Sequence, residues 1–236
     1  MQQFDRKPPP KARENPCFRG RSPIPQASAY TWLMDYWPLF LVLALGLHHL
    51  QRQGQRRRTA LLAAHLQPWQ IERLMQRLVQ GYQAALDLRG SAQDEAFAAL
   101  EGAEQQLAQE FSQVAGQFSR LSPPEARTAR MALPGLVKIW PPASFDTRRV
   151  LQVHAEGIAR AVANRDGLAP RDRAFRLMAE MLLMQHSCHW FCRSRTVADA
   201  RLLAQHQTHH AQALASVGET TRQDYLAIIR GPAVGA

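Results

Sequence analysis

Two histidine-containing segments near the C-terminus carry residue types that bind transition metals. The first runs from His186 to Cys192 and the second from His206 to His210. Residues three or four apart share a face of a helix, so each segment can offer two ligands to Zn²⁺, for example His189 with Cys192. Neither segment has the spacing of a zinc motif, and no Glu-x-x-His pair of the di-iron type occurs. We therefore expect no metal and no cofactor. The alternative is a metal-dependent helical enzyme built around His186, His189, Cys192 and His206.

Nucleophilic catalysis has weaker support. Cys188 lies beside histidines in the sequence, but a thiol buried on an apolar helix has a raised pKa and is inert. The chain has no Gly-x-Ser-x-Gly elbow, no phosphate-binding glycine loop and no dinucleotide fingerprint. We therefore expect a non-enzymatic protein without catalytic residues. Its three cysteines, Cys17, Cys188 and Cys192, are too few for a disulfide framework and are expected to be reduced thiols.

The charge of the chain is strongly positive, with a formal net charge of +10 over 236 residues. Lysine occurs only at positions 7, 11 and 138, so 26 of the 29 basic residues are arginines. A chain rich in arginine, alanine and leucine is typical of a GC-rich bacterial genome, which accounts for part of this bias. The excess of positive charge favours anionic partners, namely lipid head groups, nucleic acid or acidic protein segments.

Arginines of the last third cluster near the expected helix ends. A guanidinium binds a carboxylate or a phosphate with two parallel hydrogen bonds, so such a cluster favours an acidic peptide or a nucleic-acid backbone. The alternative is an ordinary solvated surface, because no nucleic-acid-binding motif accompanies the charges. The wider set of basic residues includes Arg148, Arg149, Arg160 and Arg201. The residues predicted to bind a partner are Arg165, Arg171, Arg173, Arg176, Arg193 and Arg195.

Residues 30–50 have the composition of a membrane span. A helix of this length matches the ~30 Å hydrocarbon layer of a bilayer. Tyr and Trp side chains gather at its N-terminal end, as in the aromatic belts of membrane proteins. The alternative is a buried core helix, because the uninterrupted apolar run covers only residues 37–47 and Asp35 precedes it. Arginines follow the span and are expected to contact lipid head groups: Arg52, Arg56, Arg57 and Arg58.

The charges flanking this span bear on its orientation. Basic residues occur within about twenty residues on both sides, and those on the C-terminal side are nearer and denser. This distribution favours an inner-membrane protein whose C-terminal part is cytoplasmic. The preceding residues 1–29 are rich in proline and arginine, and we expect them to be a disordered tail.

Residues 51–121 are expected to form a juxtamembrane helical hairpin. One amphipathic helix begins near Pro68, and Ser91 with Asp94 resembles a capping box that starts the next. The second helix has an apolar seam of alternating three- and four-residue steps, in which Glu104 occupies one position. The seam favours packing on the first helix, with a coiled coil to another subunit as the alternative. Its apolar residues are Phe97, Leu100, Leu107, Phe111, Val114, Phe118 and Leu121.

The remaining chain divides into a proline-rich, irregular connector over residues 122–143 and a helical domain over residues 144–236. Ser144, Pro170 and Thr196 mark expected helix starts, and Gly167 and Gly218 mark expected ends. Runs of alternating β-branched residues are absent, so we expect no sheet. The fold class is therefore all-α, with one N-terminal transmembrane helix, a hairpin and a small helical bundle.

These features together predict a non-enzymatic, membrane-anchored subunit of a bacterial envelope complex, of the secretion or conjugation type. Lipids, other subunits and acidic protein segments are its expected partners. A membrane-tethered nucleic-acid-binding protein is the alternative, because the same arginines can contact phosphates. The sequence indicates no small-molecule substrate.

Overall fold

The computed structural model describes residues 27–130 and 144–231, with side chains from Tyr36 onwards. The chain divides into two compact units, residues 1–46 and residues 47–236. Most of residues 1–29, predicted to be a tail, and most of the predicted connector 122–143 lie outside the described residues.

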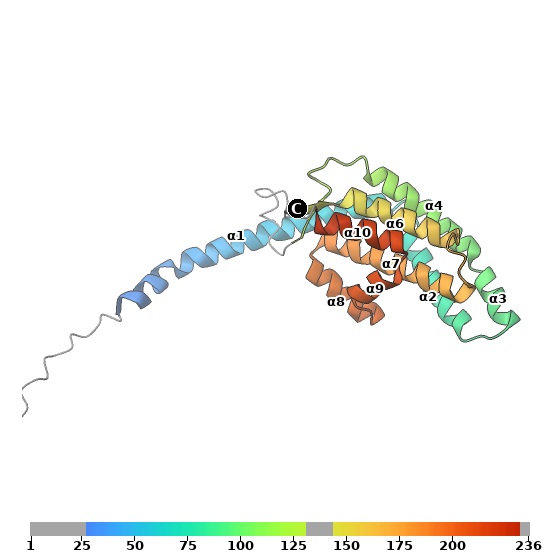
Figure 1. Cartoon of the computed structure of the whole chain (residues 1–236). Coiled ribbons are helices and arrows are strands. Elements are labelled where there is room, and N and C mark those ends of the chain that lie inside the picture. Colours follow the sequence, from blue (N-terminus) through green and yellow to red (C-terminus); the bar gives the residue numbers. More distant parts are fainter. Residues whose placement is uncertain (1–26, 131–143, 232–236) are drawn as a thin grey trace, which may run out of the picture. The chain divides into compact units, whose positions relative to one another are not determined.

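The described chain is mostly helical (Figure 1). The expectation of an all-α protein is therefore confirmed at the level of the fold class. In chain order the elements are α1 (Ala27–Leu66), α2 (Ile71–Leu86), α3 (Ser91–Ala98), α4 (Glu101–Phe118), β1 (Arg127–Ala129), β2 (Ser144–Asp146), α6 (Thr147–Val162), α7 (Pro170–Cys192), α8 (Arg195–His206), α9 (His210–Ser216) and α10 (Glu219–Arg230).

Helix α7 is the central element of the second unit. It contacts α2, α6, α8, α9 and β1, and α6 in turn contacts α4 and α10. Its side chains are apolar on most sides, so only a position surrounded by other helices removes them all from water. Pro170 stands at its first turn, where the missing N–H has no helical partner in any case. Leu177, Met181 and Phe191 are completely buried in the core that results.

The apolar seam predicted in the second helix of the hairpin is buried within the chain's own core. Leu107, Phe111, Val114 and Phe118 are each at most 1% exposed. They pack with residues of α2, α6 and α7, and α4 contacts both α2 and α6. The expected packing of this seam on the first helix of the hairpin is therefore observed, and the side chains that the alternative, a coiled coil to another subunit, would need are buried in that contact.

Three predicted helix starts differ from the observed ones. Gly90, with a φ of 62°, precedes α3, and Ser91 makes no capping hydrogen bond. Asp146 caps α6 in place of Ser144, and Ser194 caps α8 in place of Thr196. In both cases a side chain with a suitable oxygen lies two residues from the expected one, so composition alone did not distinguish them.

The predicted absence of a sheet is wrong for the described residues. Strands β1 and β2 pair antiparallel, with Arg127 opposite Asp146, Thr128 opposite Phe145 and Ala129 opposite Ser144. Each strand has only three residues, which is too short for the period of two that identifies a strand in a sequence. The long helix predicted from Ser91 is also interrupted, because residues 99 and 100 form a turn between α3 and α4.

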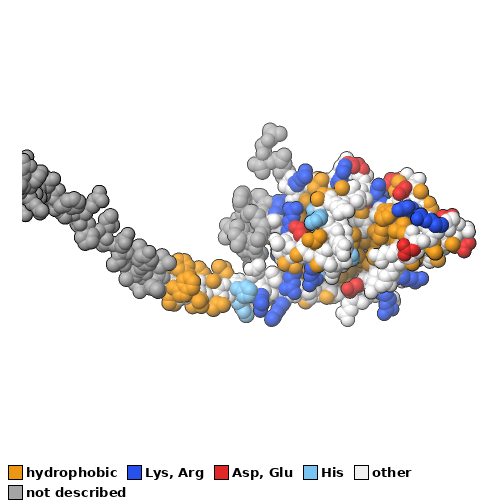
Figure 2. Space-filling model, turned by 90° about the horizontal axis from the view of Figure 1, so that it is seen from below, with side chains coloured by type: hydrophobic (Ala, Val, Ile, Leu, Met, Phe, Trp, Pro, Cys, Tyr) orange, Lys and Arg blue, Asp and Glu red, His pale blue; other side chains and the backbone are white. Residues whose placement is uncertain are grey.

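The apolar part of α1 is exposed on every side. Consecutive residues of a helix point about 100° apart, so residues 39–43 cover its whole circumference. Leu39, Phe40, Val42 and Leu43 are each 57–64% exposed, and Leu41 is 46% exposed. Figure 2 shows this apolar stretch followed along the chain by histidines and then by arginines. Within the part of the chain that was described, no helix meets the length and apolarity required to cross a membrane.

Candidate functional site

The six arginines predicted to bind a partner do not form one patch. Arg173 lies in the first turn of α7, whereas Arg193 and Arg195 follow its C-terminal end. Twenty residues of helix at 1.5 Å per residue separate the two groups by about 30 Å. The prediction from the sequence therefore grouped residues that the fold places at opposite ends of α7.

Several of these arginines have partners within the chain. Arg176 forms an ion pair with Asp166 at 3.1 Å, and Arg195 lies over the ring of Trp190. Arg193 donates to the side-chain oxygen of Gln55 at 3.0 Å. Arg165 and Arg171 are exposed at the α6–α7 connection, where Arg171 lies over the ring of Phe175. These contacts fix the side chains to the protein's own surface.

Arg173 belongs to an interior network. Its Nη2 lies 3.2 Å from Oε2 of Glu104, the charged residue in the seam of α4, which is only 2% exposed. The hydroxyl of Tyr82 donates to the other oxygen of Glu104 at 2.6 Å. Burial and this hydrogen bond both raise the pKa of Tyr82. The network joins α2, α4 and α7, so Arg173 has a structural role and is removed from the set of partner-binding residues.

Arginines do converge on a pocket of about 300 Å³ beside the two strands. Its described lining contains four arginines, contributed by β1, by the residue after it and by the first turn of α6. We call it the arginine pocket. It is lined by Pro123, Arg127, Arg130, Ser144, Phe145, Asp146, Arg148, Arg149, Ala227, Ile228 and Gly231.

The two strands are held in place by polar contacts to α6 and α7. Thr128 and Thr147 share a buried hydrogen bond of 2.6 Å, and the N–H of Thr147 donates to the carbonyl of Ala126. The indole N–H of Trp190 donates to the carbonyl of Ala129 at 2.9 Å. The ring of Phe145 packs edge-on against Trp190, with ring centres 4.9 Å apart. The two strands that contribute to the pocket lining are therefore packed on the C-terminal part of α7.

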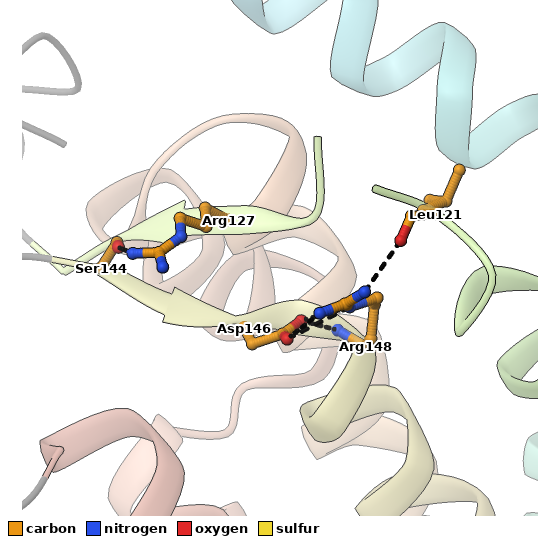
Figure 3. Close-up of polar contacts among 5 residues, drawn as sticks. All are labelled: Leu121, Arg127, Ser144, Asp146 and Arg148. Atoms are coloured by element: carbon orange, nitrogen blue, oxygen red, sulfur yellow. Dashed lines mark hydrogen bonds and ion pairs between the residues drawn. The ribbon is translucent and has the colours of Figure 1, made fainter. Parts of the chain in front are cut away.

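Arg148 is fixed by four hydrogen bonds (Figure 3). Its guanidinium donates to both carboxylate oxygens of Asp146, the shortest contact being 2.6 Å, and also to the carbonyl of Leu121 at 2.8 Å. The side chain of Asp146 accepts from the backbone N–H of Arg148 as the cap of α6. The hydrogen bond to Asp146 raises the pKa of Arg148. This paired arginine ties the end of α4 to the start of α6.

Arg127 and Arg130 are also positioned by neutral oxygens. Arg127 donates to the hydroxyl of Ser144 at 3.1 Å (Figure 3). Arg130 donates to the carbonyls of Ile229 at 2.6 Å and Ile228 at 3.1 Å, at the C-terminal end of α10. A cation is favourable there, because the last carbonyls of a helix carry partial negative charge. Burial lowers the pKa of Arg130.

Gly231 permits this approach of Arg130. It has a φ of 76°, a conformation that other residues adopt with strain. A Cβ on Gly231 would lie 2.9 Å from Nη2 of Arg130. The C-terminal stop of α10 and the placement of Arg130 therefore depend on the same glycine.

Arg149 is the fourth arginine in the described lining of the pocket. It is exposed, and no partner for its guanidinium occurs among residues 27–130 and 144–231. The described lining holds four arginines and one aspartate, a formal charge of +3. Guanidinium groups stay protonated at any physiological pH, so the pocket retains this charge. Its chemistry suits an anionic group that accepts two parallel hydrogen bonds, such as a carboxylate or a phosphate.

The histidine and cysteine segments do not assemble into a metal site. Within the described residues, no group of three or more His, Cys, Asp or Glu side chains could hold a metal ion. His186 bonds to Asp199 at 2.7 Å, His189 to Arg201 at 3.3 Å, and His206 to Gln185 at 3.1 Å. The proposed metal ligands thus have separate partners on α7 and α8.

The polar residues inside the bundle form a second buried network. His154 is fully buried and shares a 2.8 Å hydrogen bond with the hydroxyl of Ser187. His210 lies 3.3 Å from the hydroxyl of Tyr225, and its ring centre is 4.3 Å from that of His186. Burial lowers the pKa of His154 to about 3 and that of His210 to about 4. Both rings are therefore neutral at pH 7. Their contacts connect α6 with α7, and α9 with α7 and α10.

The two described cysteines are free thiols. Burial raises the pKa of Cys188 to about 12 and also raises that of Cys192. A protonated, buried thiol is a poor nucleophile and a poor metal ligand.

The arginines predicted to contact lipid head groups divide into two kinds. Arg52, Arg56 and Arg57 are exposed on α1. The guanidinium of Arg58 instead lies over the ring of Phe191, 5.8 Å from its centre, and burial lowers its pKa. Arg58 therefore packs on α7, and only the other three can face a lipid head group.

The pocket was not predictable from the sequence for two reasons. Arg127 and Arg130 fall in the predicted connector, and Arg148 and Arg149 were only part of the general basic set. The available signals were the Arg-Arg pair after a capping aspartate and the Arg-Thr-Ala-Arg segment following two prolines. Neither shows that residues about twenty positions apart meet, because that depends on a pair of three-residue strands.

Comparisons with known proteins add no relative: no family model, no curated protein and no solved structure matches this chain.

Proposed function

We propose that this protein is a non-enzymatic, membrane-anchored subunit of a bacterial envelope complex of the secretion or conjugation type. Residues 30–50 anchor it to the inner membrane, and its cytoplasmic helical domain takes an acidic segment of a partner protein into the arginine pocket. The single observation that carries the proposal is the lining of that pocket, four arginines against one aspartate.

The positions of these arginines support binding to an external anion. Arg130 donates to carbonyl oxygens and Arg127 donates to a hydroxyl oxygen, and these contacts orient the two guanidinium groups. Pre-oriented donors lose little conformational freedom when a ligand arrives, which favours affinity. Arg149 is exposed at the mouth and suits the first contact with an approaching carboxylate.

The pocket favours an acidic protein segment over nucleic acid. Single-stranded nucleic acids need a track of phosphate contacts with aromatic side chains on which bases stack. Phe145 is the one aromatic residue in the described lining, and it is buried against Trp190. A compact pocket with three net charges fits one or two carboxylates.

The exposed apolar residues of α1 support the anchor. Large side chains from Trp37 to Leu50 are exposed on all faces, a pattern that costs free energy in water and is stable in lipid. The exposed arginines Arg52, Arg56 and Arg57 follow, at the position where anionic head groups would lie. The proposed anchor also includes residues 30–35, whose side chains lie outside the described set.

Fractionation of lysed cells tests the anchor. The double substitution Leu41→Arg with Leu43→Arg places two charges in the apolar stretch, and each charge costs about 2.5–3.5 kcal/mol at the centre of a membrane helix. We expect the wild-type chain in the membrane pellet and the variant in the supernatant after ultracentrifugation without detergent.

The matched control makes the same substitutions at two exposed leucines of the second compact unit, Leu88→Arg with Leu203→Arg. This control should remain in the pellet. A wild-type chain in the supernatant, or a control that moves with the variant, contradicts the proposed anchor.

A further inference from the structure

A second pocket adjoins the arginine pocket. It has a volume of about 240 Å³ and is lined by residues of α6 and α10 only. Arg149, Ala227 and Ile228 line both pockets, so the two cavities share a wall. The residues of this second pocket, which we call the apolar pocket, are Arg149, Gln152, Val153, Asp224, Ala227 and Ile228.

The apolar pocket is a groove between two packed helices. On α6 the lining residues are Arg149, Gln152 and Val153, which lie three and four positions apart along the helix. Those on α10 begin at Asp224 and have the same spacing, so each set lies on one helix face. Val153 and Ile228 are partly buried against the neighbouring core and present aliphatic surface. Gln152 and Asp224 are exposed, which gives the groove a polar rim.

We propose that the two pockets form one bipartite site for an extended protein segment with an acidic and an aliphatic side chain two residues apart. The acidic side chain enters the arginine pocket and the aliphatic side chain enters the apolar pocket. This inference rests on the proposed function and specifies the sequence that the partner presents.

The spacing follows from the geometry of an extended chain. Side chains at positions i and i+2 point to the same side and lie roughly 7 Å apart. The two pockets are adjacent, because they share Arg149, Ala227 and Ile228, so neighbouring side chains on one side of an extended segment can enter both while the intervening residue points away from the groove. An acidic residue in the apolar pocket would meet Asp224, so like-charge repulsion fixes the direction of the segment.

The chemistry of the groove favours a peptide over a lipid. The volume of about 240 Å³ suits one branched aliphatic side chain and is far too small for an acyl chain. The rim supplies a carboxylate in Asp224 and an amide in Gln152, which can bind the N–H and carbonyl groups of a peptide backbone. The polar rim suits an extended protein segment, because the backbone groups of such a segment must keep hydrogen-bond partners.

The test measures the binding of three fluorescent heptapeptides to the full chain in mild detergent. The first contains Glu-Ser-Leu between Gly-Ser flanks, the second has Gln for Glu, and the third has Ser for Leu. We expect the first to bind most tightly and each replacement to weaken binding about tenfold, as the loss of one well-placed group does.

Two variants assign each half of the peptide to its pocket. Arg127→Gln, at a residue that lines the arginine pocket alone, should reduce the preference for Glu over Gln and leave most of the preference for Leu over Ser. Gln152→Phe should fill the groove and abolish the preference for Leu over Ser; because Gln152 is exposed and lines the apolar pocket alone, this variant keeps the core and the arginine pocket intact. Gln113→Ala, at an exposed position on α4, is the control and should bind all three peptides as the wild type does.

The outcomes separate this inference from the proposed function. If the wild type prefers Glu over Gln but binds the Leu and Ser peptides equally, the bipartite site is wrong and the acidic ligand stands. If Glu and Gln peptides bind equally, the proposed acidic ligand fails as well. A twelve-residue oligothymidylate and phosphatidylglycerol vesicles are tested as competitors of the first peptide. The peptide assignment is overturned if either one displaces it at a lower concentration than the same peptide without its fluorophore does.

Discussion

Arg173 and Arg149 lie on neighbouring helices of one domain, and their surroundings differ in almost every respect. Arg173 is 14% exposed and lies 3.2 Å from a carboxylate that is itself only 2% exposed. Arg149 is exposed at the mouth of a pocket whose described lining has a charge of +3. The first arginine compensates a buried charge of the protein, and the second adds to the positive charge of the described pocket lining. The number of arginines in a sequence therefore says little about binding until the position of each acidic residue is known.

The interior differs from the pocket in its response to pH as well. The interior around α7 contains histidines whose pKa is lowered by burial. It also contains Glu180, a buried residue of α7 whose pKa burial raises. The described pocket lining contains arginines, which do not titrate near neutral pH, and Asp146. Conditions that destabilise the domain therefore need not change the charge of the pocket.

The largest effect is expected from Arg173→Ala. The substitution leaves Glu104 buried without its cation, and breaking a buried pair in this way costs about 3–5 kcal/mol. The free energy of unfolding, measured by urea denaturation of the full chain in detergent, should fall by that amount. Arg171→Ala, two residues earlier and exposed, should change it by less than about 0.5 kcal/mol. An equal loss in the two variants would show that the Glu104 network is not a structural ion pair.

A smaller effect is expected from acidification. The pKa of His154 is about 3 in the folded chain, below the ordinary value of 6.5, so its neutral form favours folding. Below pH 6.5 the unfolded chain binds a proton that the folded chain excludes, and stability falls until the pH reaches the folded pKa. Between pH 7 and pH 5 this histidine should contribute a loss of about 2 kcal/mol.

The matched variant for this prediction is His154→Gln, which removes the titrating ring. Its side chain keeps a hydrogen-bonding group for Ser187. The variant starts from a lower stability at pH 7, but its loss between pH 7 and pH 5 should be smaller than that of the wild type by about 2 kcal/mol. Identical pH slopes for the two proteins would show that His154 is accessible to protons in the folded state.

The smallest effect on stability is expected at the pocket mouth. Arg149→Glu changes an exposed residue without a partner in the described chain, so the free energy of unfolding should change by less than about 0.5 kcal/mol. The same substitution should strongly weaken the binding of an acidic peptide. A large loss of stability would mean that Arg149 resembles Arg173 and would remove the distinction between the two regions.

The helical class was predictable because the amphipathic period persists over long segments. The seam residues from Phe97 to Phe118 are buried, as their spacing indicates. Pro170 begins α7, and residues 164 and 167, with positive φ, follow α6 as expected. Local rules of this kind depend on neighbouring residues alone. They placed caps only to within two residues, because several side chains in one turn can accept the same hydrogen bond.

The candidate site was not predictable in the same way. Arg127 and Arg148 meet because two three-residue strands pair, and strands that short have no pattern of their own. Arg173 and Arg193 were grouped because both lie near helix ends, although the length of α7 separates them. Glu104 was recognised as an unusual residue in an apolar seam, but its partner could be found only from the packing of α4 and α7. Tertiary contacts between distant segments decide which charges remain available.

The most direct test of the account compares two charge reversals, Arg149→Glu in the pocket and Arg171→Glu on the exposed surface of α7. Both change the net charge of the chain equally. The measurement is the dissociation constant of the Glu-Ser-Leu peptide for each full-length variant at the same ionic strength. If the peptide binds in the arginine pocket, we expect its affinity to fall at least about tenfold for Arg149→Glu and less than about twofold for Arg171→Glu. Equal losses would show that the peptide responds to overall positive charge and would contradict a binding site in the arginine pocket.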